Sequence, residues 1–135
     1  MAEIGSGGIL IEPARFPGRA PIDAYGNGGF RFADMSHRGS ILALPSGIEA
    51  WPGGDAGIVD MASLERVVDH PEIDVLLIGT GDATVPLTAE AKTRLNAAGL
   101  WPDVMSTGAA VRTYNVLLSE GRAVAAALMA VGSNR

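Results

Sequence analysis

The stretch that decides the fold is DVLLIGTG, residues 74–81. Its apolar run continues without interruption to Ile78, which is typical of a strand buried on both faces of a sheet. Gly79 and Gly81 follow at once and indicate a tight exit from that strand. The stretch therefore predicts a central strand that ends in a turn.

One helix is predicted before this strand in the sequence, over about residues 60–71, and two after it, over about residues 88–98 and 107–120. A short strand over residues 100–105 is predicted between the last two helices. In the first helix, Met61, Leu64 and Val68 recur at the spacing of one helix face. Gly99 and Gly121 follow the other two as C-terminal stops. Strands and helices that alternate in this way predict βα crossovers and a largely parallel sheet.

The first half of the chain reads as a meander of short strands separated by glycine and proline. These strands are predicted over residues 9–11, 22–25, 30–32, 40–44 and 48–51. Asn27-Gly28 predicts a hairpin, because both residues tolerate the positive φ of the primed turns. The last apolar segment, residues 123–131, is open: its alanines favour a helix, whereas its short length after a helix stop favours a buried strand.

These elements predict a single α/β domain with a mixed central β-sheet, N-terminal antiparallel strands and about three helices. A chain of 135 residues leaves no room for a second independent core. Residues 1–8 are small and polar, so we expect a flexible N-terminal arm there and the domain over residues 9–135.

Composition excludes several classes of function. The formal net charge is −5, and the few basic residues are scattered, so neither nucleic acid nor an anionic lipid surface is an expected partner. The longest run of small apolar residues, 123–131, is far shorter than the roughly 20 residues of a membrane-spanning helix. The start, MAEIGSGG, lacks the pattern of a secretory or mitochondrial signal, so we expect a cytoplasmic protein without membrane insertion.

The chain has no cysteine and two histidines, which removes thiol nucleophiles and thiolate metal sites. His37 and His70 have no further ligands at a spacing that suggests a metal site. No G-x-S-x-G context exists for a serine nucleophile. We therefore expect no metal, no cofactor and no assigned catalytic residue, which favours a protein without enzymatic activity but leaves an enzyme open.

One candidate ligand pocket begins at the turn Gly79-Thr80-Gly81-Asp82. Glycines just past the end of a buried strand leave backbone N–H groups available to an anion. A dinucleotide fingerprint would need a third glycine where Thr84 stands, and the Gly-Lys-Ser/Thr of a phosphate loop is absent. A plain tight strand exit is therefore the favoured interpretation, with the anion pocket as its alternative.

The predicted helix 107–120 would complete this pocket. Its start at Thr107 would favour an anion through the helix dipole, and Arg112 and Asn115 could bind a carboxylate or phosphate. Both features would then open into one crevice, where α/β sheets favour ligands. The alternative is a solvated polar face, with Tyr114 filling the core.

Trp51 and Trp101 each precede a proline at the end of an element. Trp51 is the candidate partner surface, because exposed tryptophan is enriched at interfaces, although packing at the edge of the core is equally open for it. Packing in the core is favoured for Trp101.

Four segments carry a resemblance: YGNGGFRF (25–32), HRGSILALPSG (37–47), DVLLIGTG (74–81) and TGAAVRTYNVLLSEGRAVAAAL (107–128). In this order and spacing they resemble a small-domain family of uncharacterised bacterial and archaeal proteins. That family also contains the mitochondrial complex I assembly factor three and the adipogenesis-associated Mth-domain protein. The resemblance implies a three-layer α/β fold with the last apolar segment as a strand, and no established catalytic mechanism or cofactor. Some relatives carry cysteine where this chain has Val111, so a thiol role cannot be transferred.

Two functions remain open at this stage. The first is a non-enzymatic interaction or assembly-factor-like protein with an unidentified protein partner. The second is a binder of a small anionic molecule, or an enzyme, that uses the turn of residues 79–82 and the helix of residues 107–120. A homo-oligomer is possible because a small domain has many strand edges, but the number of subunits is not determined.

Overall fold

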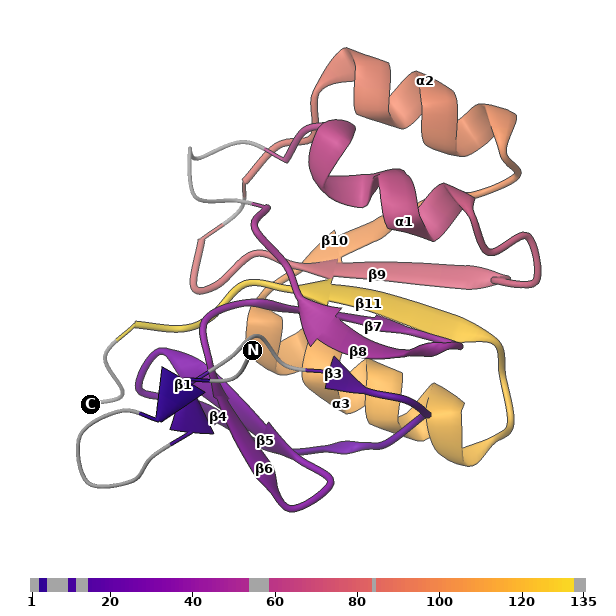
Figure 1. Ribbon diagram of the computed structural model, residues 1–135. Coiled ribbons are helices and arrows are strands. Elements are labelled where there is room, and N and C mark those ends of the chain that lie inside the picture. Colours follow the sequence, from indigo (N-terminus) through magenta and orange to yellow (C-terminus); the bar gives the residue numbers. More distant parts are fainter. Residues whose placement is uncertain (1–2, 5–9, 12–14, 54–58, 84, 133–135) are drawn as a thin grey trace.

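Figure 1 shows the computed structural model, which describes residues 3–4, 10–11, 15–53, 59–83 and 85–132. The helices are α1 (Glu65–Val68), α2 (Ala89–Ala97) and α3 (Thr107–Ser119), and a 3₁₀ turn, Ala62–Leu64, leads directly into α1. The strands are β1 (Glu3–Ile4), β2 (Leu10–Ile11), β3 (Arg15–Phe16), β4 (Ile22–Gly26), β5 (Gly29–Phe32), β6 (Met35–Arg38), β7 (Ile41–Leu44), β8 (Gly47–Ala50), β9 (Val75–Gly79), β10 (Asp103–Met105) and β11 (Val124–Leu128).

The central sheet of the described residues has the strand order β10-β9-β11-β7-β8-β3. Strand β9 pairs in parallel with both β10 and β11, whereas β11, β7, β8 and β3 pair antiparallel. The predicted mixed sheet is confirmed. The parallel strands come from the second half of the chain, where helices connect them, and most antiparallel strands come from the first half.

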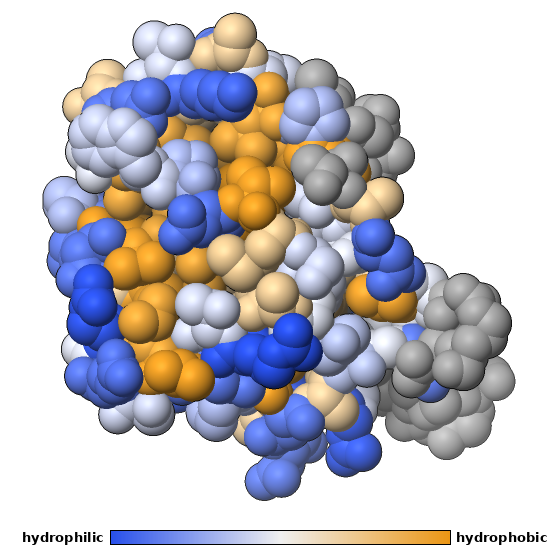
Figure 2. All heavy atoms as spheres, turned by 180° about the vertical axis from the view of Figure 1, so that it is seen from behind, coloured by the Kyte–Doolittle hydropathy of each residue, from blue (hydrophilic) through white to orange (hydrophobic). Residues whose placement is uncertain are grey.

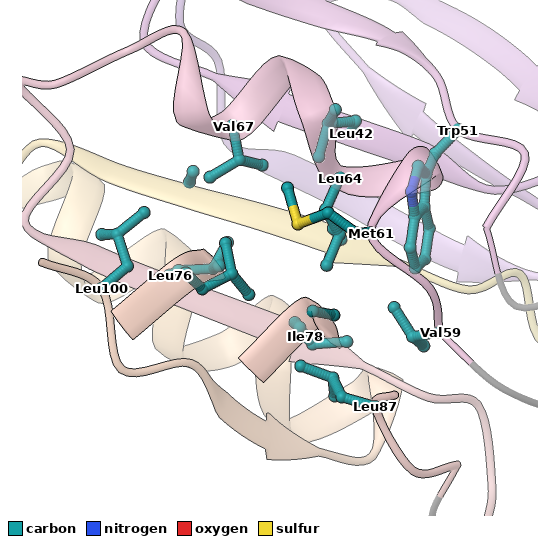
Figure 3. Packing of buried hydrophobic residues seen from close by; sticks show 14 of the residues in the cluster. Leu42, Trp51, Val59, Met61, Leu64, Val67, Leu76, Ile78, Leu87 and Leu100 are labelled. Carbon is teal, nitrogen blue, oxygen red and sulfur yellow. The ribbon is translucent and has the colours of Figure 1, made fainter. Parts of the chain in front are cut away.

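The central sheet lies between two hydrophobic cores, as Figure 1 shows with α1 and α2 on one face and α3 on the other. Successive residues of β9 point to opposite faces: Leu76 and Ile78 enter the first core and Leu77 enters the second. Figure 3 shows Leu76 and Ile78 among Leu64 and Val67 of the α1 region. This alternation explains why the run before Gly79 is apolar at every position, and the three-layer fold is confirmed.

A second sheet, β4-β5-β6, packs on the α3 side of the molecule. Asn27 (φ 53°) and Gly28 (φ 81°) form the predicted hairpin turn between β4 and β5. Strand β6 was not predicted. The turn that precedes it, Ala33 (φ 51°) and Asp34 (φ 62°), also uses two positive φ values. Alanine rarely adopts such values, so the sequence carries no strong signal for this second hairpin.

The last apolar segment forms strand β11, as the family resemblance implied, and all five of its residues are buried. It lies between β9 and β7 in the centre of the sheet. Burial on both faces outweighs the helix propensity of alanine, because propensity differs between residues by less than about 1 kcal/mol. The helix stops agree with the sequence: Gly99 and Gly121 have φ values of 85° and 77°.

Of the predicted N-terminal arm, residues 1–8, only Glu3–Ile4 is described, and this β1 pairs antiparallel with β2. The other residues of the arm lie outside the described part of the chain. Across the described residues, no helix is long and apolar enough to cross a membrane.

Candidate functional site

The two halves of the predicted pocket lie side by side. The N–H of Thr107, at the start of α3, donates to the carbonyl of Gly81 at 3.0 Å. In return, the N–H of Gly81 donates to the Thr107 hydroxyl at 2.8 Å. The turn after β9 therefore meets the N-terminus of α3, at the carboxyl end of the parallel strands.

The polar groups at this junction bond to one another. The Thr107 hydroxyl, fully buried, donates to the carbonyl of Met129 at 2.8 Å, so one side chain links the β9 turn, α3 and the end of β11. The N–H of Thr80 donates to Met105 of β10 at 2.9 Å, and its hydroxyl donates to Ala83 at 2.8 Å. The amides of Thr80 and Gly81 are thus bonded within the chain, which favours the tight strand exit over an anion site at these two residues.

The junction between β9 and α3 also leaves little space for a ligand. A Cβ added to Gly79 would lie 2.9 Å from the Cα of Thr107, 3.0 Å from the Cβ of Ala110 and 3.1 Å from a methyl group of Leu128. Glycine at this position therefore allows α3 to approach the sheet closely rather than leaving room for a ligand.

The outer side of the α3 N-terminus is partly covered by Tyr25 of β4. A Cβ on Gly108 would collide with the Tyr25 hydroxyl and lie 3.7 Å from a guanidinium nitrogen of Arg112. Ser106 is the N-cap of the helix, and its hydroxyl accepts the N–H of Ala109 at 3.2 Å. The side chains of Tyr25 and Arg112 therefore both lie close to Gly108, in the first turn of α3.

Asn115 contributes to the fold rather than to an open pocket. Its amide side chain accepts the N–H of Ile22 and donates to the carbonyl of Ile22, both at 2.9 Å. It thus takes the place of a neighbouring strand and ties β4 to α3. Tyr114 lies in the second core, where its hydroxyl donates to Ala20 at 3.0 Å, and burial raises its pKa to about 12.

Of the predicted pocket residues, Asp82 and Arg112 are the two exposed to solvent. Gly79, Thr80 and Thr107 are buried within the junction. The sequence places these residues near one another because strand ends and helix starts meet at one edge of the sheet. It carries no signal that their hydrogen-bonding groups are already used.

The two tryptophans lie in environments other than those expected. Trp51 is 3% exposed and its indole N–H donates to the carbonyl of Ser63 at 2.8 Å, so the candidate partner surface at Trp51 is corrected to a core position. Trp101, expected in the core, is 70% exposed. Leu100 takes the buried place beside it, at 4% exposure.

Exposed large apolar side chains lie near the edge strand β10 and on α3. They are Trp101, Val104 at 38% exposure and Val116 at 54% exposure, with Tyr25 at 39% on β4. Figure 2 shows apolar atoms gathered in a band on the face that carries α3 and β10.

The histidines contact neighbouring groups of the fold. His70 bonds through one ring nitrogen to the hydroxyl of Ser46 at 2.8 Å and through the other to the carbonyl of Arg66 at 2.9 Å. Partial burial lowers the pKa of His37. Within the described residues, no group of three His, Asp or Glu side chains is placed to hold a metal ion.

A family of proteins of unknown function, DUF498/DUF598, matches residues 22–129. The chain belongs to this family. Among similar DUF498/DUF598 proteins is an uncharacterized protein of Rhodobacter capsulatus, 42% identical over 87% of this chain and 90% of its own length. Another is the zebrafish NADH dehydrogenase [ubiquinone] 1 alpha subcomplex assembly factor 3, 35% identical over 80% of this chain. The matched region spans 63% of that assembly factor, and 59% of the human one.

Solved structures agree with the DUF498/DUF598 assignment. A Bartonella henselae protein described as an outer membrane protein is 56% identical, with a TM-score of 0.79 over 86% of this chain and 98% of that one. A Bordetella pertussis protein described as a Mth938-like domain is 27% identical, with a TM-score of 0.71 over 85% of this chain and 88% of that one. The resemblance to the Mth-type domain is thereby confirmed.

Proposed function

We propose that this chain is a non-enzymatic protein-binding protein with an assembly-factor-like role. The observation that carries the proposal is the similarity to assembly factor 3 of complex I, which covers 80% of this chain. An assembly factor acts by binding other proteins, so a relative that shares this role would use an interaction surface rather than a reaction centre. The assembly factor is longer than the matched region, so its partners are not transferred.

The exposed side chains support this proposal. Trp101 is 70% exposed, and Val104 on the adjoining strand is 38% exposed. Tryptophan is enriched among the residues that dominate binding energy at protein interfaces, because it buries a large apolar area with little loss of side-chain freedom. The anionic-ligand alternative has less support, since the Thr80 and Gly81 amides bond within the chain.

A cytoplasmic place of action is part of the proposal. The Bartonella relative is described as an outer membrane protein, so the location of this chain needs a direct test. Cell fractionation with an antibody against the chain tests it directly. Recovery in the membrane fraction after a high-salt wash would contradict a cytoplasmic location.

The proposed function is tested by capture from the extract of the cells that produce the chain. We expect a partner that binds the wild-type chain. The amount captured with Trp101→Ala should be about tenfold lower, which is the loss typical of a binding hot spot. Thr93→Ala, which changes an exposed residue of α2, is the matched control and should recover the partner as the wild type does.

The captured partner is then purified, and its binding to the chain is measured in isolation to separate direct from indirect recovery. A chain that recovers nothing except further copies of itself would count against the proposal. Equal recovery by Trp101→Ala and the wild type would place the interaction elsewhere on the molecule.

A further inference from the structure

Strand β10 ends the central sheet and has β9 as its one neighbour among the described strands. The N–H of Thr80, just past β9, donates to the carbonyl of Met105 at 2.9 Å, so the backbone of Met105 faces β9. Successive residues of a strand direct their N–H and C=O groups to opposite edges. The N–H and C=O of Val104 therefore point away from the sheet, toward the open side.

The residues before Val104 limit what this edge can bind. Pro102 has no N–H, so Val104 carries the outward donor of this short edge. Trp101 and Val104 are exposed beside it. Asp103 is exposed as well, and no described residue forms an ion pair with its carboxylate.

We propose that the outer edge of β10 takes up an extended segment of a protein partner by β-strand addition, with a basic side chain of that segment beside Asp103. This inference rests on the proposed function and specifies its surface. An added strand would exchange hydrogen bonds with Val104, and an apolar side chain would pack against Trp101. Its Lys or Arg would neutralise the carboxylate of Asp103.

Charge argues for this occupant over a second copy of the chain. Each copy carries a formal net charge of −5. Antiparallel pairing of β10 with itself about Val104 would place each Asp103 opposite Met105 of the other copy, with the two unpaired Asp103 carboxylates as diagonal neighbours on one face and no cation between them. Like charges brought together at an interface oppose association, whereas a basic segment is attracted.

The test uses the full ¹⁵N-labelled chain and a synthetic peptide, acetyl-Lys-Val-Thr-Val-Thr-Val-Lys-amide. A matched peptide carries Glu in place of each Lys. We expect the largest amide shift changes in the segment from Trp101 to Met105, and an affinity about tenfold weaker for the Glu peptide. Absence of binding at millimolar peptide, or shift changes confined to another face, would overturn the proposal.

Two variants identify the contacts. Val104→Pro removes the outward N–H while leaving the bonds of Asp103 and Met105 to β9 intact, so it should abolish peptide binding. Its control is Val104→Thr, which is also β-branched and should bind the peptide. Asp103→Lys should reverse the preference between the two peptides. If Val104→Pro lowers the thermal midpoint of the free chain, the Asp103→Lys reversal decides the question. Unchanged binding by Val104→Pro, or no reversal, would overturn the proposal.

Three further outcomes separate this inference from its alternatives. Sedimentation that shows association of the free chain, lost in Val104→Pro, would identify a second copy as the occupant and overturn the inference. A partner captured from extract equally by wild type and Val104→Pro, but not by Trp101→Ala, would leave the proposed function standing and refute the strand addition. Peptide binding at β10 with no captured partner would support the strand addition and count against the proposed function.

Discussion

Two Trp-Pro dipeptides lie at the ends of elements in this chain, and their environments are opposite. Trp51 follows β8 and is 3% exposed, whereas Trp101 precedes β10 and is 70% exposed. Each dipeptide has a glycine nearby, with Gly53 directly after the first and Gly99 two residues before the second. The difference must therefore come from the strands to which they are attached.

Strand β8 has neighbours on both sides, β7 and β3, and Leu64 of the 3₁₀ turn Ala62–Leu64 lies in the same core as Trp51. That turn presents the carbonyl of Ser63 to the indole N–H of Trp51. A Cβ at Gly53 would collide with the indole ring, so glycine is required for the chain to pass over it. Trp51 is thus enclosed by the segment that follows it.

Among the described strands β10 has one neighbour, and Leu100 rather than Trp101 lies in the first core with Ala91 and Leu95 of α2. Because successive side chains of an extended segment point in opposite directions, burying Leu100 turns Trp101 outward. A Trp-Pro pair thus indicates where an element ends, but the position of its strand in the sheet determines whether the indole is core or surface.

The largest expected effect tests the difference between Trp51 and Trp101 directly. Trp51→Ala should lower the free energy of unfolding by about 3–5 kcal/mol, because it leaves a large cavity in the first core. Trp101→Ala should change it by less than about 0.5 kcal/mol, as surface substitutions do. Urea unfolding followed by circular dichroism measures both. Similar losses for the two variants would show that Trp101 is packed rather than exposed.

The next largest effect concerns the junction between β9 and α3. Thr107→Val keeps the shape of the side chain but removes the hydroxyl that bonds Gly81 and Met129. We expect a loss of about 2 kcal/mol in the free energy of unfolding, since a partly buried N–H and a buried carbonyl lose their partner. Asp82→Ala, on the exposed side of the same turn, is the control and should stay within about 0.5 kcal/mol. A neutral Thr107→Val would mean that water reaches this junction.

The sequence predicts those elements whose ends carry their own signals. Strand β9 is apolar throughout and is followed by glycine, and α2 begins after Thr88, whose hydroxyl accepts the N–H of Ala91 at 3.1 Å. Gly99 and Gly121 end α2 and α3 with the positive φ that glycine tolerates. These features depend on contacts within a few residues, so the local sequence is sufficient for them.

The candidate site was less predictable because its chemistry depends on distant contacts. Asn115 looks like an exposed polar residue on α3, yet its amide bonds to Ile22, 93 positions away. The turn at residues 79–82 looks open, yet the Thr107 hydroxyl occupies the Gly81 amide. Which groups remain free is decided by how α3 packs on the sheet, and no pattern in the sequence reports that.

A pH-dependent effect of intermediate size tests the second core at Tyr114. Burial raises the pKa of its hydroxyl from 10.0 to about 12, because the folded protein disfavours the charged form. Above pH 10 the unfolded chain loses this proton more readily, so stability falls as pH rises. The expected loss between pH 9 and pH 11 is about 1.4 kcal/mol, one pKa unit of linkage.

Urea unfolding of the wild type across this pH range measures the effect, and Tyr114→Phe is its control. The variant should be less stable at pH 9, because it lacks the hydrogen bond to Ala20. Its stability should then fall less between pH 9 and pH 11 than that of the wild type. Parallel pH profiles for the two proteins would show that Tyr114 is not the titrating group.

The smallest expected effect distinguishes Asn115 from Arg112, two polar residues of α3 that the sequence predicts to line one pocket. Asn115→Ala should cost about 1 kcal/mol of stability, because the partly buried N–H and carbonyl of Ile22 lose their side-chain partner. Arg112→Ala, at an exposed position, should be neutral. Amide hydrogen exchange gives a local measurement: the Ile22 amide should exchange faster in Asn115→Ala and at the wild-type rate in Arg112→Ala. Faster exchange at Ile22 in both variants would mean that Arg112 also helps to hold β4 against α3 and contributes to the fold rather than only to its solvent face.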